Sequence, residues 1–233
     1  MKVLHLISGG AAQGLVSQLA ARFEAGQGAS VQGSFGAVGL MKDKLLAGAP
    51  CDVVILTAAL IAELEANGHV LAGSARPLGV VRTGVAMKAG EAMPAVDSPQ
   101  ALAALLRKAS GIYFPDPVKA TAGIHFMKVL KTLGLDQQLA GQLRPFPNGA
   151  TAMREMAQAP GTDLVGCTQV TEILYTPGVQ LIGVLPRQFE LATTYTAAVC
   201  SRAADPGTAA ELIRLLSAEE TQPLRLAGGF ALD

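Results

Sequence analysis

Residues 3–24, VLHLISGGAAQGLVSQLAARFE, decide the fold of this chain. The apolar run Val3–Ile7 predicts a β-strand, and two glycines directly after Ser8 end it. Leucines and a phenylalanine then recur four residues apart, which predicts a helix over Ala12–Glu24. A strand that turns into a helix through glycines is typical of an α/β protein with largely parallel sheets.

Two further strand-to-helix turns are built from glycine or small residues. Phe35–Gly39 and Asp116–Gly123 each precede a helical pattern. The first amides of a helix have no partners within it, and the helix dipole favours negative charge there, so we expect these turns to bind a small anion. Such glycines can also serve close packing alone. In the first two turns the residues expected at the ligand are Ser8, Gly9, Gly10, Ala11, Ala37 and Val38.

The rest of the chain continues the alternation of β-rich runs and helical patterns. No linker, repeat or low-complexity segment interrupts it. In the tail, Ser217 and Glu220 are spaced as a capping box, which predicts a helix over 218–226. The other predicted strands cover 31–35, 53–56, 80–87, 112–114, 164–166, 179–185 and 195–200, and the other predicted helices cover 38–47, 59–66, a segment opening at Ser98-Pro99, 122–133, 169–175 and 206–216.

The order of these elements predicts two lobes joined by two crossings of the chain. We expect residues 1–80 and 193–233 to form the first lobe and residues 81–192 the second, with crossings near Val81 and Thr193. Ligand clefts commonly lie between such lobes, so the anion is expected there.

Composition excludes several classes of function. Lys plus Arg and Asp plus Glu number 18 each, and no basic block occurs, so no nucleic-acid partner is expected. Apolar runs such as Val53–Ala59 are too short to cross a bilayer, so no membrane insertion is expected. Neither a G-x-G-x-x-G nor a Gly-Lys-Ser/Thr pattern occurs, and we expect no cofactor.

The three cysteines, Cys51, Cys167 and Cys200, are far apart in the sequence and odd in number. A disulfide framework is therefore not expected, at least one thiol must be free, and the spacing of a zinc site is missing, so no metal is expected. Residues 1–7 show no pattern of a secretory leader. Two locations stay open: the periplasm, if a signal peptide has been removed, or the cytoplasm.

Several motifs resemble the molybdate-binding periplasmic protein family. They are Ser34–Gly39, Leu46–Val53, Asp116-Pro117 with Ala122-Gly123, and the closing Gly228-Gly229-Phe230, in the family's order over essentially the whole chain. The resemblance implies a type II periplasmic binding protein fold, in which two α/β lobes hold an oxyanion by hydrogen bonds. For an exported member it also implies an ABC transporter permease as partner.

The resemblance also implies positions for the ligand contacts. The two serines of the family fall on Ala11 and Val38, its backbone donors in the second lobe fall on Ala122 and Gly149, and its tyrosine falls near Gln169. Without the two hydroxyl groups, oxygens of a tetrahedral anion would stay unpaired, at about 1–3 kcal/mol each. We therefore expect a small organic carboxylate as the ligand in preference to molybdate.

A different polar set accompanies these positions: Thr121, Asn148, Thr168 and Gln169, with Lys42 in the helix after the second turn. Amides, hydroxyls and a lysine are suited to planar carboxylate groups. Thr168 and Gln169 directly follow a predicted strand. The polar set therefore supports a carboxylate site.

The alternative is an enzyme on the same scaffold, because aconitate isomerase, which shifts a proton on an allylic tricarboxylate, is associated with this family. Such an enzyme needs a base near the substrate carbons, and His125 and Lys42 are the candidates. Each also has a simpler interpretation, as a partly exposed helix residue and a solvated lysine. Asp116 is interpreted as a cap of its turn, and Cys167 as a core residue.

Overall fold

The structure is a computed structural model that describes residues 2–232. Helices and strands alternate along almost the whole of this range. The described part of the chain is therefore an α/β protein. None of the helices in residues 2–232 has the length and apolar character needed to cross a membrane.

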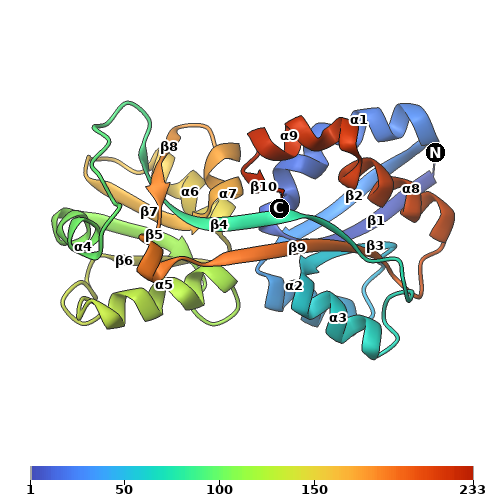
Figure 1. The fold of residues 1–233 in the computed structure, drawn as a ribbon, viewed down its shortest axis with the longest axis horizontal. Helices are drawn as coiled ribbons and strands as arrows, with labels where there is room; N and C mark the ends of the chain where they lie inside the picture. The colour runs from blue at the N-terminus through green and yellow to red at the C-terminus, as the bar shows by residue number, and fades with distance from the viewer. Residues whose placement is uncertain (1, 233) are drawn as a thin grey trace. The chain divides into compact units, whose positions relative to one another are not determined.

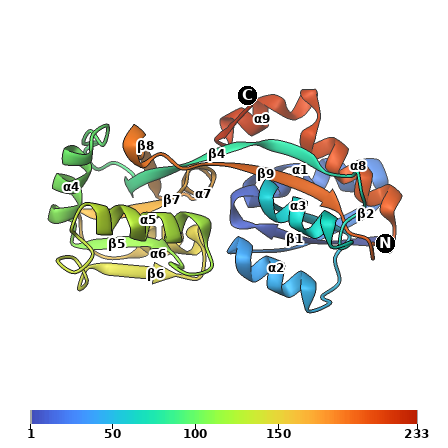
Figure 2. The same cartoon turned by 60° about the horizontal axis from the view of Figure 1, so that its bottom comes forward.

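The chain divides into two compact units. Met1–Val81 and Thr193–Asp233 form the first, called unit 1 below, and Arg82–Ala192 form the second, called unit 2. The chain passes into unit 2 within strand β4 (Arg76–Lys88) and returns within strand β9 (Ala192–Val199), as Figure 1 and Figure 2 show.

Unit 1 is built around a sheet with the strand order β2-β1-β3-β9. β1 pairs in parallel with β2 and β3, whereas β9 runs antiparallel to β3. Every residue of β3 except the last is buried, as expected of a strand covered on both faces. The strands are β1 (Lys2–Gly9), β2 (Ala29–Gly36), β3 (Val53–Thr57) and, paired with β4, β10 (Phe230–Ala231).

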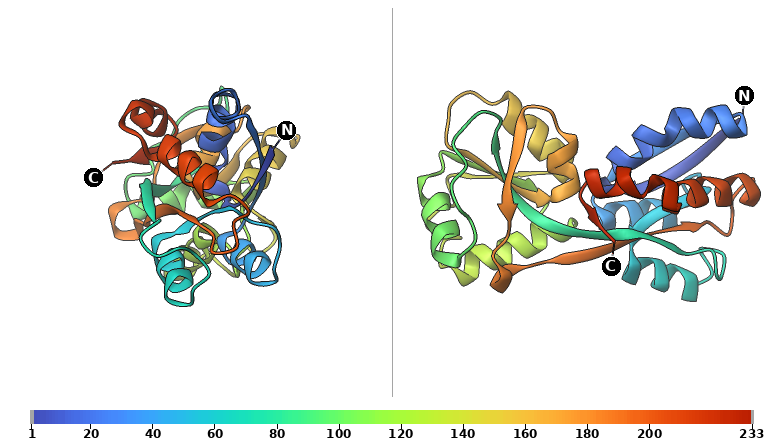
Figure 3. Two further views of the ribbon diagram at one scale, coloured as in Figure 1. Left: turned by 90° about the vertical axis from the view of Figure 1, so that its right-hand side faces the viewer. Right: turned by 45° about the horizontal axis from the view of Figure 1, so that its top comes forward.

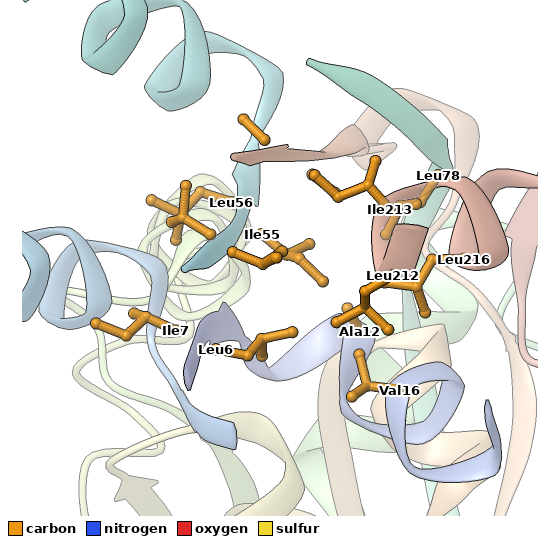
Figure 4. Close-up of a cluster of buried hydrophobic side chains, with 14 of the residues drawn as sticks. Leu6, Ile7, Ala12, Val16, Ile55, Leu56, Leu78, Leu212, Ile213 and Leu216 are labelled. Atoms are coloured by element: carbon orange, nitrogen blue, oxygen red, sulfur yellow. The ribbon is translucent and has the colours of Figure 1, made fainter. Parts of the chain in front are cut away.

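Helices cover both faces of this sheet, with α1 and α8 on one face and α2 and α3 on the other (Figure 1 and Figure 3). Leu212 and Leu216 of α8 lie beside Ala12 and Val16, in the core that Leu6 of β1 also enters (Figure 4). The helices are η1 (Gly10–Ala12), α1 (Gln13–Gln27), α2 (Val38–Leu46), α3 (Ala58–Ala66), α8 (Pro206–Ser217), η3 (Glu219–Thr221) and α9 (Gln222–Ala227).

Unit 2 has a mixed sheet in the order β4-β7-β5-β6. The strands β5, β6 and β7 are parallel, and β4 pairs antiparallel with β7 and with β8. Successive residues of β5 reach opposite faces: Ile112 and Phe114 enter one hydrophobic cluster, and Tyr113 packs against a second. The strands are β5 (Gly111–Pro115), β6 (Leu143–Phe146), β7 (Leu164–Gln169) and β8 (Val179–Val184).

The two clusters of unit 2 separate its helices. Leu102 and Leu106 of α4 and Phe126 of α5 belong to the first cluster, whereas Met153 and Met156 of α6 belong to the second. The helices are α4 (Pro99–Lys108), α5 (Thr121–Thr132), α6 (Gly149–Gln158), α7 (Val170–Tyr175) and η2 (Arg187–Phe189). The sheet of unit 2 is thus covered on both faces.

The structure confirms the type of every predicted strand and helix before the tail. It adds the strand β6 and the helix α6, together with the short elements η1, η2 and β10. The sequence analysis did not predict β6, because Pro145 and an arginine break the apolar pattern of this strand at the edge of the sheet. It also missed α6, because Asn148-Gly149 reads as a turn and the helix is rich in small residues. The start of α6 contributes to the candidate site described below.

The predicted capping box in the tail is wrong. Ser217 is the last residue of α8, and its hydroxyl donates to the carbonyl of Ile213 at 2.8 Å. Glu220 lies in a 3₁₀ turn and pairs with Arg22 of α1 at 2.7 Å. Ser217 therefore belongs to the end of α8 and does not cap the helical segment that follows, as the local pattern had predicted.

Candidate functional site

The first two glycine turns lie side by side at the carboxyl edge of the unit 1 sheet. Gly9 and Gly36 occupy partner positions in the parallel pairing of β1 with β2, so both strands end at the same level. The helices that follow begin at Gly10 and Val38. In open α/β sheets, ligands bind beyond the carboxyl ends of the strands, so this edge is the candidate site of unit 1.

The β1 turn is closely packed. A Cβ atom at Gly9 would lie 2.8 Å from Cγ1 of Val38 and 3.1 Å from Cε1 of Tyr195. The hydroxyl of the buried Ser8 donates to the carbonyl of Gly9 at 2.8 Å. Ala11 is 2% exposed, so its side chain is also part of the core. Packing therefore accounts for part of the small-residue pattern.

The turn from β5 to α5 forms a corresponding edge in unit 2. Oδ1 of Asp116 accepts the amides of Val118 and Lys119 at 2.6 and 2.8 Å, so this carboxylate caps its own turn. A Cβ atom at Gly123 would clash with the carbonyl oxygens of Pro115 and Asp116, so the first turn of α5 packs directly on the strand end. Thr121 and Ala122 are the first two residues of this helix.

Four helices have amino ends that side chains cap: α3, α4, α6 and α8, by Thr57, Ser98, Asn148 and Asp205. By contrast, within residues 2–232, no side chain caps η1, α1, α2 or α5, nor the shorter elements α7, α9, η2 and η3. Of these, η1 with its continuation α1, α2 and α5 follow the three glycine or small-residue turns. The first amides of an uncapped helix have no side-chain partner, and an anion can bind to such amides.

A buried carboxyl group lies at the start of α6. Glu172 of α7 is 6% exposed, and the amides of Gly149 and Ala150 donate to its carboxylate. The amide of Gln169 and the hydroxyl of Thr168 donate as well. Burial raises the pKa of Glu172 above its usual value, although each of these hydrogen bonds acts in the opposite direction.

Several predicted ligand residues gather around this carboxyl group. Oδ1 of Asn148 accepts the amide of Thr151 at 2.8 Å, as a helix cap does. A Cβ atom at Gly149 would clash with the hydroxyl of Thr168 and the carboxylate of Glu172, so only glycine fits there. The structure therefore brings Asn148, Gly149 and Thr168 together, and their contact with a ligand stays a prediction.

The strand next to β7 adds a hydroxyl group to this cluster. Thr83 of β4 is the pairing partner of Gln169 and is 1% exposed. Its hydroxyl has no hydrogen-bond partner among the described residues. Buried hydroxyl groups are normally paired, so Thr83 joins the candidate site.

The two candidate bases each have a partner within their own unit. Nζ of Lys42 lies 3.0 Å from a carboxylate oxygen of Glu63, in an exposed ion pair between α2 and α3. Nε2 of His125 lies 2.8 Å from the carbonyl oxygen of Phe189, which leaves Nδ1 as the other ring nitrogen. A catalytic role of either stays a prediction.

Glu172 and Thr83 are the site residues that the sequence analysis missed. Glu172 stands in the otherwise mostly apolar segment VTEILY, and an acidic residue there is a signal that could have found it. Thr83 gives no such signal, because a threonine within a strand is ordinary. Cys167 is a fully buried core residue, and burial raises the pKa of its thiol.

The described residues contain no group of three or more His, Cys, Asp or Glu side chains that could hold a metal ion. The site is instead built from amides, hydroxyls and one buried carboxyl group. Amide and hydroxyl donors can bind an anion by hydrogen bonds. The donors around Glu172 are already bonded to its carboxyl group.

The fold, two α/β units between which the chain passes within β4 and β9, is that of the type II periplasmic binding proteins. Residues 4–231 match the family model of the bacterial extracellular solute-binding proteins, and the chain belongs to this family.

The periplasmic molybdate-binding protein of Azotobacter vinelandii is similar over 99% of both chains, with 20% identity and a TM-score of 0.80. Peb3 of Campylobacter jejuni with L-phospholactate bound is similar over 99% of this chain and 100% of that chain, with 14% identity and a TM-score of 0.70. An aconitate isomerase from Pseudomonas sp. is 25% identical over 228 residues, 93% of this chain and 83% of the relative. The two solved structures show that proteins of this fold bind different small anions.

Proposed function

We propose that this protein binds a small organic carboxylate through the amino ends of uncapped helices and neutral polar side chains. The observation that carries the proposal is the division of the described helices of nine or more residues: α1, α2 and α5 begin without a side-chain cap, whereas α3, α4, α6 and α8 have one. The uncapped ends follow the strand-to-helix turns at the carboxyl edges of β1, β2 and β5, where this family of folds binds ligands.

The side chains at these turns favour a carboxylate over a tetrahedral oxyanion. Ala11 and Val38 are apolar and buried, and the hydroxyl of Ser8 is bonded to its own backbone. Unit 2 supplies Thr121 and Asn148 as neutral polar groups. L-phospholactate, bound to Peb3, combines a carboxylate with a tetrahedral phosphate group, so this neighbour supports a small organic anion without separating the two classes. A receptor of this type would deliver its ligand to an ABC transporter.

A thermal-shift panel tests the ligand class. It would contain molybdate, tungstate, sulfate, L-phospholactate and small di- and tricarboxylates, including cis- and trans-aconitate. A ligand at about 100 times its Kd adds roughly 2.7 kcal/mol to the free energy of unfolding, so a clear rise in Tm is expected with a carboxylate. A rise with molybdate but with none of the carboxylates would contradict the proposal.

Asn148 allows the ligand role to be separated from the helix cap. Asn148→Ala removes the cap and is expected to lower stability by about 1 kcal/mol, whereas Asn148→Asp keeps it. Both should weaken binding of the carboxylate found in the panel, because one removes the amide and the other adds a negative charge. Unchanged Kd in both variants and in Lys42→Ala would show that this map of the site is wrong. Ser98→Ala, which removes the cap of α4, is the control that should lower stability and leave Kd unchanged.

The second candidate function is an isomerase that shifts a proton on a small tricarboxylate, and the aconitate isomerase relative favours it. The reaction needs groups that remove a proton from one carbon and return one to another. Proton NMR in D₂O with cis-aconitate would show formation of trans-aconitate with deuterium at a carbon position. His125→Ala and Glu172→Gln then test two titratable groups of unit 2 as candidates for the proton transfer. Binding of aconitate without turnover supports the receptor.

A further inference from the structure

Two cysteines that are far apart in the sequence meet in unit 1. The Sγ atoms of Cys51 and Cys200 lie 3.3 Å apart, and all three cysteines are free thiols. The antiparallel pairing of β3 with β9 brings the two together, because it extends to a bond from the amide of Cys200 to the carbonyl of Asp52 at 2.9 Å. The backbone therefore holds both positions in place.

The two thiols are oriented along one line of hydrogen bonds. The Cys200 thiol donates to the sulfur of Cys51, and the Cys51 thiol donates to the carbonyl of Val53 at 3.1 Å. A disulfide needs a sulfur–sulfur distance of about 2.05 Å, so the two atoms must approach by little more than one ångström. The proposal requires that rotation of the side chains provide this movement.

A cavity of about 250 Å³ reaches this pair. Both cysteines line it, together with His69 and Arg202 and several small or apolar residues. Both residues are buried, and Cys51, 8% exposed, is the more accessible of the two, since Cys200 is 2% exposed. Arg202 places a positive charge in the wall of this cavity, which favours the binding of an anionic molecule.

We propose that Cys51 and Cys200 are a redox-active pair that forms an intramolecular disulfide by exchange with a small anionic disulfide of the glutathione type. The Cys51 thiolate attacks one sulfur of the oxidant, which releases one equivalent of reduced thiol. The Cys200 thiolate then attacks the sulfur of Cys51 in the mixed disulfide and releases the second. Two thiol protons and two electrons pass from the protein to the oxidant, which leaves as two thiols.

The geometry also explains the order of the two steps. The hydrogen bond to Cys51 and burial raise the pKa of Cys200, which disfavours Cys200 as the first nucleophile. In the mixed disulfide, Cys51 no longer has a thiol group, so the thiol–thiol hydrogen bond between Cys200 and Cys51 is lost. Cys200 then becomes the resolving residue.

The disulfide would tie together the two separate segments of unit 1. Cys51 lies in the segment before unit 2 and Cys200 in the segment after it. A link across so long a stretch of chain restricts the unfolded state strongly and stabilises the folded state, provided that the bond is unstrained. Oxidation should therefore raise Tm of the whole protein by several degrees.

Peptide mapping by mass spectrometry tests the proposal on the full chain. The protein is incubated with oxidised glutathione, blocked with an alkylating reagent and digested without reduction. The expected result is a linked pair of peptides that contain Cys51 and Cys200, with Cys167 alkylated. The thiol count in denaturant should fall from three to one.

Three alanine variants provide the controls. Cys167→Ala should keep the link and the rise of Tm on oxidation, whereas Cys51→Ala and Cys200→Ala should lose both. Their Tm values under reducing conditions report whether the substitutions themselves disturb folding. Three reactive thiols after oxidation, a stable glutathione adduct on Cys51 without the internal link, or a link to Cys167 would each overturn the proposal.

Discussion

At the level of one residue, Glu172 is an acidic side chain that is buried in unit 2 and hydrogen-bonded to backbone amides. The start of α6 presents backbone amides, and the carboxylate of Glu172 accepts two of them, from Gly149 and Ala150. A helix amino end favours negative charge, and this one is occupied by a group of the chain itself. α6 is thus distinct from α1, α2 and α5, whose first amides face no side-chain cap among residues 2–232.

The raised pKa of Glu172 predicts a pH dependence of stability. Between the unfolded value, about 4.3, and the higher folded value, the folded state keeps a proton that the unfolded state has lost. Stability conferred by Glu172 is therefore full at low pH and falls as pH rises through this range. Glu172→Gln removes this titration. The free energy of unfolding of the wild type minus that of the variant should therefore fall as pH rises, by at most about 1.4 kcal/mol per pH unit.

Urea unfolding of both proteins between about pH 5 and pH 8 measures this difference. Glutamine resembles the protonated carboxyl group in size and can accept the amide hydrogen bonds. A difference that grows as pH rises would mean that the hydrogen bonds outweigh burial and that the folded state prefers the carboxylate.

At the level of elements, contact between a helix and the end of its strand shapes the turn of unit 2. Gly123 stands where α5 crosses the carbonyl oxygens of Pro115 and Asp116. Asp116 uses its own carboxylate to hold the following amides. The amino end of α5 is thereby placed close to the sheet edge, and no side chain among residues 2–232 caps it.

Gly123→Ala should therefore destabilise the protein by roughly 1–3 kcal/mol, the usual range for overpacking. Gly26→Ala is the matched control, because this glycine lies in α1 with no atom within 4 Å of the added Cβ. Alanine is the better helix former, so the control should gain about 0.5–1 kcal/mol. Chemical unfolding of both variants measures the effects. Equal changes in the two variants would contradict the packing argument.

At the level of the whole molecule, unit 1 is discontinuous in sequence. Its two segments come together around the pairing of β3 with β9, and the chain enters and leaves unit 2 within β4 and β9. Two crossings of this kind are typical of proteins whose domains move on hinges. The proposed function therefore includes closure of the two units on the ligand.

Small-angle scattering tests this closure. Addition of the anion that gives the largest rise in Tm should lower the radius of gyration, because a ligand bound by both units favours the more compact state. An anion without effect on Tm is the control and should leave the radius unchanged. An unchanged radius at saturation with the bound anion would contradict closure.

The sequence by itself determined the alternation of strands and helices, the fold class and the turns at the ends of β1, β2 and β5. These features follow from periodicity, glycine placement and capping residues, which act over a few neighbouring positions. Because these signals are local, they did not predict β6 and α6, whose patterns are weak. They also assigned Ser217 to the wrong helix, because it lies between two helices and belongs to the end of α8.

Only the tertiary structure decided which distant side chains meet. Glu172 faces the start of α6, Thr83 lies beside Gln169, and Cys51 meets Cys200. These contacts depend on strand order and register, which join segments with tens of residues or more between them in the chain. The free energy that selects the register comes from burial over the whole sheet, so no short stretch of sequence contains it.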